Sequence, residues 1–230
     1  MTTIIGLCGS LRRGSFNLML LHAAADAAPA GTSIEIESIR EIPLYDGDFE
    51  AEHGSPPSVD RLKRRIAGAD GVLIVTPEYN GSMPGVLKNA IDWLSRPPSD
   101  IGRLFRARPV ALMGATPGRG ATALSQAAWL PVLRSLGMRP WFEGSVLISE
   151  ASTVFDRNGR VIDAAVQNRI RTFVEGFATF VEAQRGSRLV AAPNVTAGSP
   201  SNHDQPRPPF PNLSLSPLVS ASSDPSPAKS

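Results

Sequence analysis

The alternation of short apolar runs with longer amphipathic stretches constrains the fold of this chain more than any other sequence feature. Each of five apolar or alternating runs precedes a stretch with helical periodicity. The predicted strands are 3–8, 33–39, 71–76, 109–115 and 140–148, and the predicted helices are 16–28, 58–68, 84–96, 121–136 and 162–184. Strands and helices that alternate in this way predict an α/β fold in which helices cover both faces of a parallel sheet.

The polarity of the strands also predicts their order. The runs 3–8, 71–76 and 109–115 are apolar throughout, which is typical of interior strands. The run 33–39 alternates apolar with charged residues, which indicates one face in water. We therefore expect a five-stranded sheet in the order 2-1-3-4-5. In this order the chain reverses direction between strands 1 and 3, and ligands bind at such a point, beyond the carboxyl ends of the strands.

Composition excludes several classes of function. The one cysteine, Cys8, permits neither an internal disulfide nor a cysteine-based zinc cluster, and the three histidines are far apart in sequence. A net charge of +2 gives no strong field for nucleic acid. We find no apolar run of the ~18 residues that a membrane span needs and no basic leader after Met1. We therefore expect a cytoplasmic protein with no metal, nucleic-acid or membrane partner.

The composition changes near Gly186, where a segment rich in proline and serine begins. This segment has one aromatic residue, Phe210, and no helical or strand periodicity. Such a chain buries too little apolar surface to offset its ordering entropy. We predict a folded domain over 1–185 and a disordered tail over 186–230, for which a proline-rich docking arm is the alternative. Residues 46–58 are predicted to form a surface loop.

The loop after the first predicted strand, residues 9–17, has the composition of a phosphate site. It combines two glycines, two serine hydroxyls, an asparagine amide and two guanidinium groups in front of a predicted helix. Such donors, with the backbone N–H groups of a helix start, bind a phosphate dianion. The spacing matches neither a P-loop nor a dinucleotide fingerprint, and Gly14 stands where a phosphatase loop built on Cys8 would need arginine. Helix capping is the alternative for Ser15 and Asn17.

The loop after the third predicted strand, residues 76–84, suits a flat heterocycle. It offers the Tyr79 ring, a proline near each end and backbone amides on a turn. Amides can bond the edge of a ring while apolar surface covers its face. A third loop, 114–121, has small residues that let backbone approach the same ring. Ordinary turns are the alternatives for both loops. A phosphate at one loop and a planar ring at the next describe a mononucleotide, FMN in particular.

These motifs resemble those of the NAD(P)H-dependent FMN reductases, which have the flavodoxin-like fold. The run Gly9-Ser10-Leu11-Arg12 is similar to their phosphate loop, and 77–94 is similar to their ring-binding loop and the helix after it. The resemblance covers about 3–185 and implies a three-layer α/β/α sandwich. It implies FMN contacts for Ser10, Arg12, Ser15 and Asn17 at the phosphate, for Pro77, Glu78, Tyr79, Asn80, Gly81 and Ser82 along the ring, and for Thr116 and Gly118 in the rest of the pocket. Ala121 departs from the glycine that the family often carries near this position.

The same resemblance implies an oxidoreductase. NADPH or NADH would reduce bound FMN, which would pass electrons to a small acceptor such as a quinone, a flavin, chromate or an azo compound. We predict no catalytic acid or base, and we expect the Glu78 side chain to point to solvent. A flavodoxin-type electron carrier without NAD(P)H activity is the alternative. Similar proteins form homodimers or homotetramers with the flavin near a subunit boundary, which makes Lys88, Asp92 and Trp93 candidate interface residues.

Overall fold

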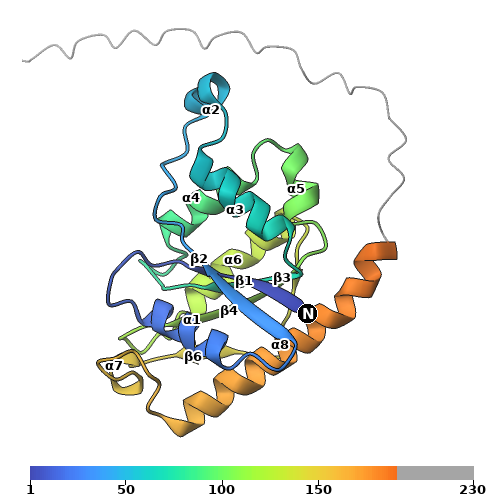
Figure 1. Cartoon of the computed structure of the whole chain (residues 1–230). Coiled ribbons are helices and arrows are strands. Elements are labelled where there is room, and N and C mark those ends of the chain that lie inside the picture. The colour runs from blue at the N-terminus through green and yellow to red at the C-terminus, as the bar shows by residue number, and fades with distance from the viewer. Residues whose placement is uncertain (191–230) are drawn as a thin grey trace, which may run out of the picture. The chain divides into compact units, whose positions relative to one another are not determined.

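A parallel sheet forms the centre of the fold in the computed structural model, which describes residues 1–190 (Figure 1). Its strands are β1 (Thr2–Cys8), β2 (Thr32–Glu37), β3 (Gly71–Val75), β4 (Pro109–Ala115), β5 (Arg139–Pro140) and β6 (Val146–Ile148). They lie in the order β2-β1-β3-β4-β5, and β6 also pairs with β4. All of these pairs are parallel. The predicted order is confirmed, with β2 at one edge.

The helices cover both faces of this sheet. They are α1 (Phe16–Asp26), α2 (Gly47–His53), α3 (Pro57–Ala67), α4 (Gly85–Leu94), α5 (Ser99–Leu104), α6 (Ala123–Ser135), α7 (Ala151–Val154) and α8 (Ala164–Val190). Alternate strand residues supply two separate cores, because successive side chains of a strand point to opposite faces. Ile4 belongs to the core that residues of α1 and α8 share, and Ile5 belongs to the core that residues of α3, α4 and α6 share. The predicted three-layer sandwich is confirmed.

The predicted strand 140–148 is wrong as one continuous strand. Arg139–Pro140 pairs with the start of β4, and Val146–Ile148 pairs with its end. Between them the chain leaves the sheet, and the buried Trp141 ring packs against Gly144, where a Cβ would lie 2.5 Å from the ring. Phe142, next along the chain, is 70% exposed.

Three short helices were not predicted. The polar stretch 46–58 contains α2, whose N-cap Asp46 accepts bonds from the N–H groups of Asp48 and Phe49. The other two are α5 and α7. At the other end of the domain, α8 continues to Val190, beyond the predicted helix end at 184. The rest of the predicted tail, 191–230, lies outside the described residues. Among residues 1–190, no helix is long and apolar enough to cross a membrane.

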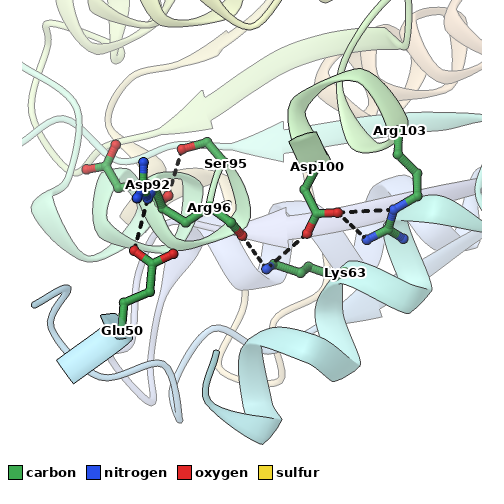
Figure 2. A network of polar contacts seen from close by, with 7 residues as sticks. All are labelled: Glu50, Lys63, Asp92, Ser95, Arg96, Asp100 and Arg103. Carbon is green, nitrogen blue, oxygen red and sulfur yellow. Dashed lines mark hydrogen bonds and ion pairs between the residues drawn. The ribbon is translucent and has the colours of Figure 1, made fainter. Parts of the chain in front are cut away.

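A polar network joins the helices on the α3 face of the sheet (Figure 2). The buried Lys63 of α3 forms an ion pair with Asp100 of α5 at 3.1 Å and donates to the backbone carbonyl of Arg96. Arg103 pairs with Asp100 at 2.8 Å, and Arg96 pairs with Glu50 of α2 at 2.9 Å. This network fixes α2, α3 and α5 to the turn that follows α4.

The sheet register brings the loops after β1, β3 and β4 together. Cys8 pairs with Val75, and Val75 pairs with Met113, so the three strands end nearly level. The Gly9 N–H donates to the Val75 carbonyl at 2.8 Å. A Cβ at Gly9 would lie 2.9 Å from Pro77, so glycine is needed where the first two loops cross.

Candidate functional site

One cleft at the carboxyl edge of the sheet is lined by all three predicted loops. Its enclosed part has a volume of about 90 Å³. The lining residues are Ser10, Arg12, Gly14, Ser15, Phe16 and Asn17 from the first loop, Pro77, Glu78 and Tyr79 from the second, and Ala115, Thr116 and Pro117 from the third. The loops therefore meet in space as the strand order predicts, although residues 18–75 separate the first from the second along the chain.

The first loop, residues 9–17, is called the phosphate loop below. It presents hydroxyl, guanidinium and backbone donors. Ser15 is the N-cap of α1, and its Oγ accepts the Leu18 N–H at 3.2 Å. The predicted alternative for Ser15 is therefore real, and the same residue lines the cleft. Because α1 begins at Phe16, the N–H groups of its first turn have no intrahelical acceptors. The Ser10 Oγ accepts the Arg12 N–H at 3.4 Å, which tightens the loop.

Asn17 holds the first loop against β4. Its Nδ2 donates to the Ala115 carbonyl at 2.8 Å, and its Oδ1 accepts the Ala115 N–H at 3.0 Å. The side chain is buried. Asn17 thus fixes the start of α1 to the end of β4, and its contact with a phosphate stays a prediction.

The second loop, residues 76–84, is called the ring loop below and contains a tight antiparallel turn. Tyr79 and Ser82 exchange two backbone bonds, each 3.0 Å long. Asn80 and Gly81 between them have φ values of +52° and +68°, the geometry that an Asn-Gly pair adopts most readily. Tyr79 is 48% exposed. Asn80, Gly81 and Ser82 form this turn and do not line the enclosed part of the cleft.

Glu78 does not point to solvent, so that expectation is wrong. Its Oε2 accepts the N–H groups of Leu124 at 2.9 Å and Ser125 at 3.2 Å. Both belong to the first turn of α6, where unpaired N–H groups attract a carboxylate. The carboxylate is therefore bound to the helix that follows the third loop.

The third loop leaves β4 at Thr116, whose N–H donates to Ile148 of β6 at 2.9 Å. Gly118 does not line the cleft. Its N–H donates to Thr116 Oγ1 at 3.3 Å, and its carbonyl accepts the Glu150 N–H at 3.0 Å. Ala121 has φ = +49°, in the left-handed region that glycine adopts without strain. Alanine here strains the backbone at the end of this loop.

Neither a thiolate nor a metal centre is evident at the cleft. Burial, the largest influence, raises the pKa of the Cys8 thiol above its ordinary value, which disfavours the thiolate. No group of three or more His, Cys, Asp or Glu side chains in the described part of the chain could hold a metal ion.

Sequence reasoning missed Arg40, a further cation at the phosphate loop. Arg40 follows β2, and its Nη2 donates to the Leu11 carbonyl. The strand order could have pointed to it, because β2 lies beside β1 in the sheet and the loop after β2 leaves at the same edge. A larger cavity of about 660 Å³ between α1 and α8 contains none of the predicted site residues.

One of the three candidate interface residues is inaccessible. Trp93 is fully buried, and its indole N–H donates to the Pro43 carbonyl at 3.0 Å. It cannot reach a partner subunit in this conformation. Lys88 and Asp92 are accessible and form an ion pair at 2.7 Å within α4.

Comparisons with known proteins identify the family. The family model described as NADPH-dependent FMN reductase matches residues 2–153. The chain belongs to this family. An NAD(P)H-dependent FMN reductase from Pseudomonas aeruginosa is 42% identical over 183 residues, which are 80% of this chain and 97% of that protein. A quinone reductase from Escherichia coli is 38% identical over 184 residues, covering 78% and 95% of the two chains.

Among solved structures, a flavoenzyme NAD(P)H:(acceptor) oxidoreductase from Paracoccus denitrificans superposes with a TM-score of 0.72 at 33% identity. The match covers 80% of this chain and 99% of that chain. The predicted enzyme class and cofactor are therefore confirmed: this FMN reductase family member is an oxidoreductase that uses FMN and NAD(P)H.

The donor set of the cleft fits FMN. Ser10, Arg12 and Ser15 gather at the start of α1, where a phosphate dianion finds hydrogen-bond donors and the positive end of a helix. Pro77 and Tyr79 line the same cleft, with the backbone of the tight turn beside them. The enclosed volume is smaller than most ligand pockets, which hold ~300–1,000 Å³. A bound FMN would therefore extend beyond this enclosed space.

Proposed function

We propose that this protein transfers hydride from NAD(P)H through FMN to a quinone. The observation that carries the proposal is the single cleft, which is lined both by donors of the phosphate loop and by Pro77 and Tyr79 of the ring loop. FMN supplies the electron-transfer chemistry when bound. The chain binds and orients it: Ser10, Arg12 and Ser15 would hold the phosphate, while Pro77, Tyr79 and Thr116 would flank the ring.

A flat acceptor suits the open side of this cleft. Tyr79 is partly exposed beside it, and a planar aromatic ring can stack against a neighbouring ring. Several relatives are named for quinone substrates, including a 2-hydroxy-1,4-benzoquinone reductase from a Burkholderia species that is 39% identical over 178 residues. These names support a quinone over chromate or azo compounds.

Anaerobic NADPH oxidation tests the proposed function. The purified protein with FMN should turn over NADPH, and NADH in a parallel assay, only when a benzoquinone is present, and without the quinone it should oxidise about one nicotinamide per bound FMN. Bound FMN that neither nicotinamide reduces would instead indicate the electron carrier. A protein that binds no FMN would contradict the proposal.

Arg12→Ala should weaken FMN binding by about 1.5–3 kcal/mol, the usual worth of a hydrogen bond to a charged group. That loss is about a tenfold to 150-fold rise in Kd, measured by titrating the apoprotein with FMN. Arg13→Ala is the matched control, because Arg13 is its exposed neighbour and does not line the cleft. Equal Kd values for the two variants would remove Arg12 from the phosphate site.

We also propose a cytoplasmic homodimer or homotetramer that uses the surface near α4. Val86 of α4 is exposed, and Leu44, in the segment anchored to α4 through Pro43, is 83% exposed. Exposed apolar residues that lie together mark association surfaces. Light scattering should give a multiple of 24.4 kDa for the native protein. A smaller particle is expected for Leu44→Glu.

A further inference from the structure

We propose that Glu78 is a positioning residue that holds the ring loop and the third loop in one arrangement before FMN binds. The inference rests on the proposed function, in which these loops flank the FMN ring. Glu78 lies on the ring loop, and its carboxylate reaches α6, the helix that begins where the third loop ends.

Helix α6 has no cap of its own. Its N-cap residue, Thr122, has φ = +64° and makes no side-chain capping bond. A helix start normally needs a nearby oxygen for its free N–H groups. Glu78 supplies that oxygen from a loop 46 residues earlier, through Oε2 on the N–H groups of Leu124 and Ser125. The cap is therefore a tertiary contact.

A second contact fixes the same two elements. The Thr76 hydroxyl, at the start of the ring loop, lies 2.8 Å from the Ser125 hydroxyl and accepts the Trp129 indole N–H at 3.1 Å. Thr76, Ser125 and Trp129 are fully buried. These contacts keep α6 attached to the ring loop without Glu78, and the Glu78 carboxylate adds the acceptor for the N–H groups of Leu124 and Ser125.

The third loop connects β4 to this first turn of α6. Its residue Gly120 lies close to the free oxygen of the carboxylate, since a Cβ there would be 3.6 Å from Glu78 Oε1. Ala121 and Thr122, at the end of the loop, both have positive φ, so the loop holds a strained backbone. Loss of the cap would let the strained end relax and would lower the fraction of molecules competent to bind the ring.

Three substitutions separate the reach of the side chain from its charge. Glu78→Gln keeps the reach and one accepting oxygen, Glu78→Asp keeps the charge but is one methylene shorter, and Glu78→Ala removes both. We expect the FMN Kd of the apoprotein to rise about tenfold in the Ala and Asp variants, the equilibrium equivalent of a lost helix cap, and less than about threefold in the Gln variant. Backbone hydrogen exchange over 116–126 should be faster in the Ala and Asp variants than in the Gln variant.

Asp163→Ala provides the matched control. The Asp163 carboxylate caps α8 through the N–H groups of Ala165 at 2.8 Å and Val166 at 3.0 Å, and it does not line the cleft. Asp163→Ala should lower Tm about as much as Glu78→Ala does, and it should leave the FMN Kd unchanged. Equal Kd changes in the two variants would overturn the positioning role, as would wild-type affinity in Glu78→Asp or Glu78→Ala. A wild-type protein that fails to bind FMN would refute the proposed function instead.

Discussion

Gly114→Ala should lower the free energy of unfolding by about 3 kcal/mol and leave the purified protein without FMN. Gly114 lies near the end of β4, where the ring loop and the start of α6 meet. A Cβ at this position would lie 2.3 Å from Thr122 Oγ1 and 2.4 Å from the Thr76 carbonyl oxygen. Both distances are shorter than any van der Waals contact, so one of the two neighbours must move.

Other contacts and burial hold both neighbours in place, so moving either one would cost stability. The Thr76 N–H donates to Met113, and its hydroxyl contacts Ser125 and Trp129. Thr122 is fully buried and leads directly into α6. The added methyl group therefore separates the ring loop from the third loop, which are the two sides of the proposed ring site.

Chemical denaturation and the ratio of flavin to protein absorbance measure the two effects of Gly114→Ala. Gly102→Ala in α5 is the control, because the added Cβ meets no atom within 4 Å apart from its chain neighbours and the backbone of its own helix. That variant should be more stable by about 0.5–1 kcal/mol, since alanine is the better helix former, and should keep its FMN. A Gly114→Ala protein with wild-type stability would contradict the packing of these loops.

Lys63→Met should destabilise the fold by about 3 kcal/mol at neutral pH, because it leaves the charge of a mostly buried carboxylate without one of its partners. Lys63 is buried, and it bridges Asp100 and the carbonyl of Arg96 (Figure 2). Arg103 still pairs with Asp100 in the variant, which limits the loss. Urea denaturation measures the change.

The effect of Lys63→Met should depend on pH. Burial alone would raise the pKa of Asp100, but hydrogen bonds and charges from Arg103 and Lys63 outweigh burial and hold the pKa below its ordinary value. A carboxyl group with a depressed pKa in the folded state contributes stability above its unfolded pKa and loses it as the pH falls through the folded pKa. The stability difference between wild type and variant should therefore shrink below about pH 4.

Arg61→Met is the control for Lys63→Met. It breaks an exposed ion pair with Glu41, so the change in stability should stay below about 0.5 kcal/mol. Asp100→Asn added to Lys63→Met should recover part of the loss, since the uncompensated charge is then gone. A double variant less stable than Lys63→Met would show that the network acts through packing.

The strand order and the place of the site could be predicted from the sequence, because both depend on local pattern. Runs such as 71–76 are apolar on both faces only in interior strands, and parallel strands bring their carboxyl ends to one edge. The phosphate loop and the ring loop were recognisable for the same reason, since each is continuous in sequence. The short helices α2, α5 and α7 were not predicted, because a helix of one or two turns has little periodicity to detect.

Tertiary structure decided what individual side chains do. Asn17, Glu78 and Trp93 each bind a backbone group supplied by a segment distant in sequence, namely Ala115, the first turn of α6 and Pro43. Residue type and spacing name the possible donors and acceptors, but only packing fixes which of them lie within bonding distance. The sequence by itself determined the sheet and the edge at which the cleft lies, whereas the folded chain determined which residues face the cleft and which hold its walls.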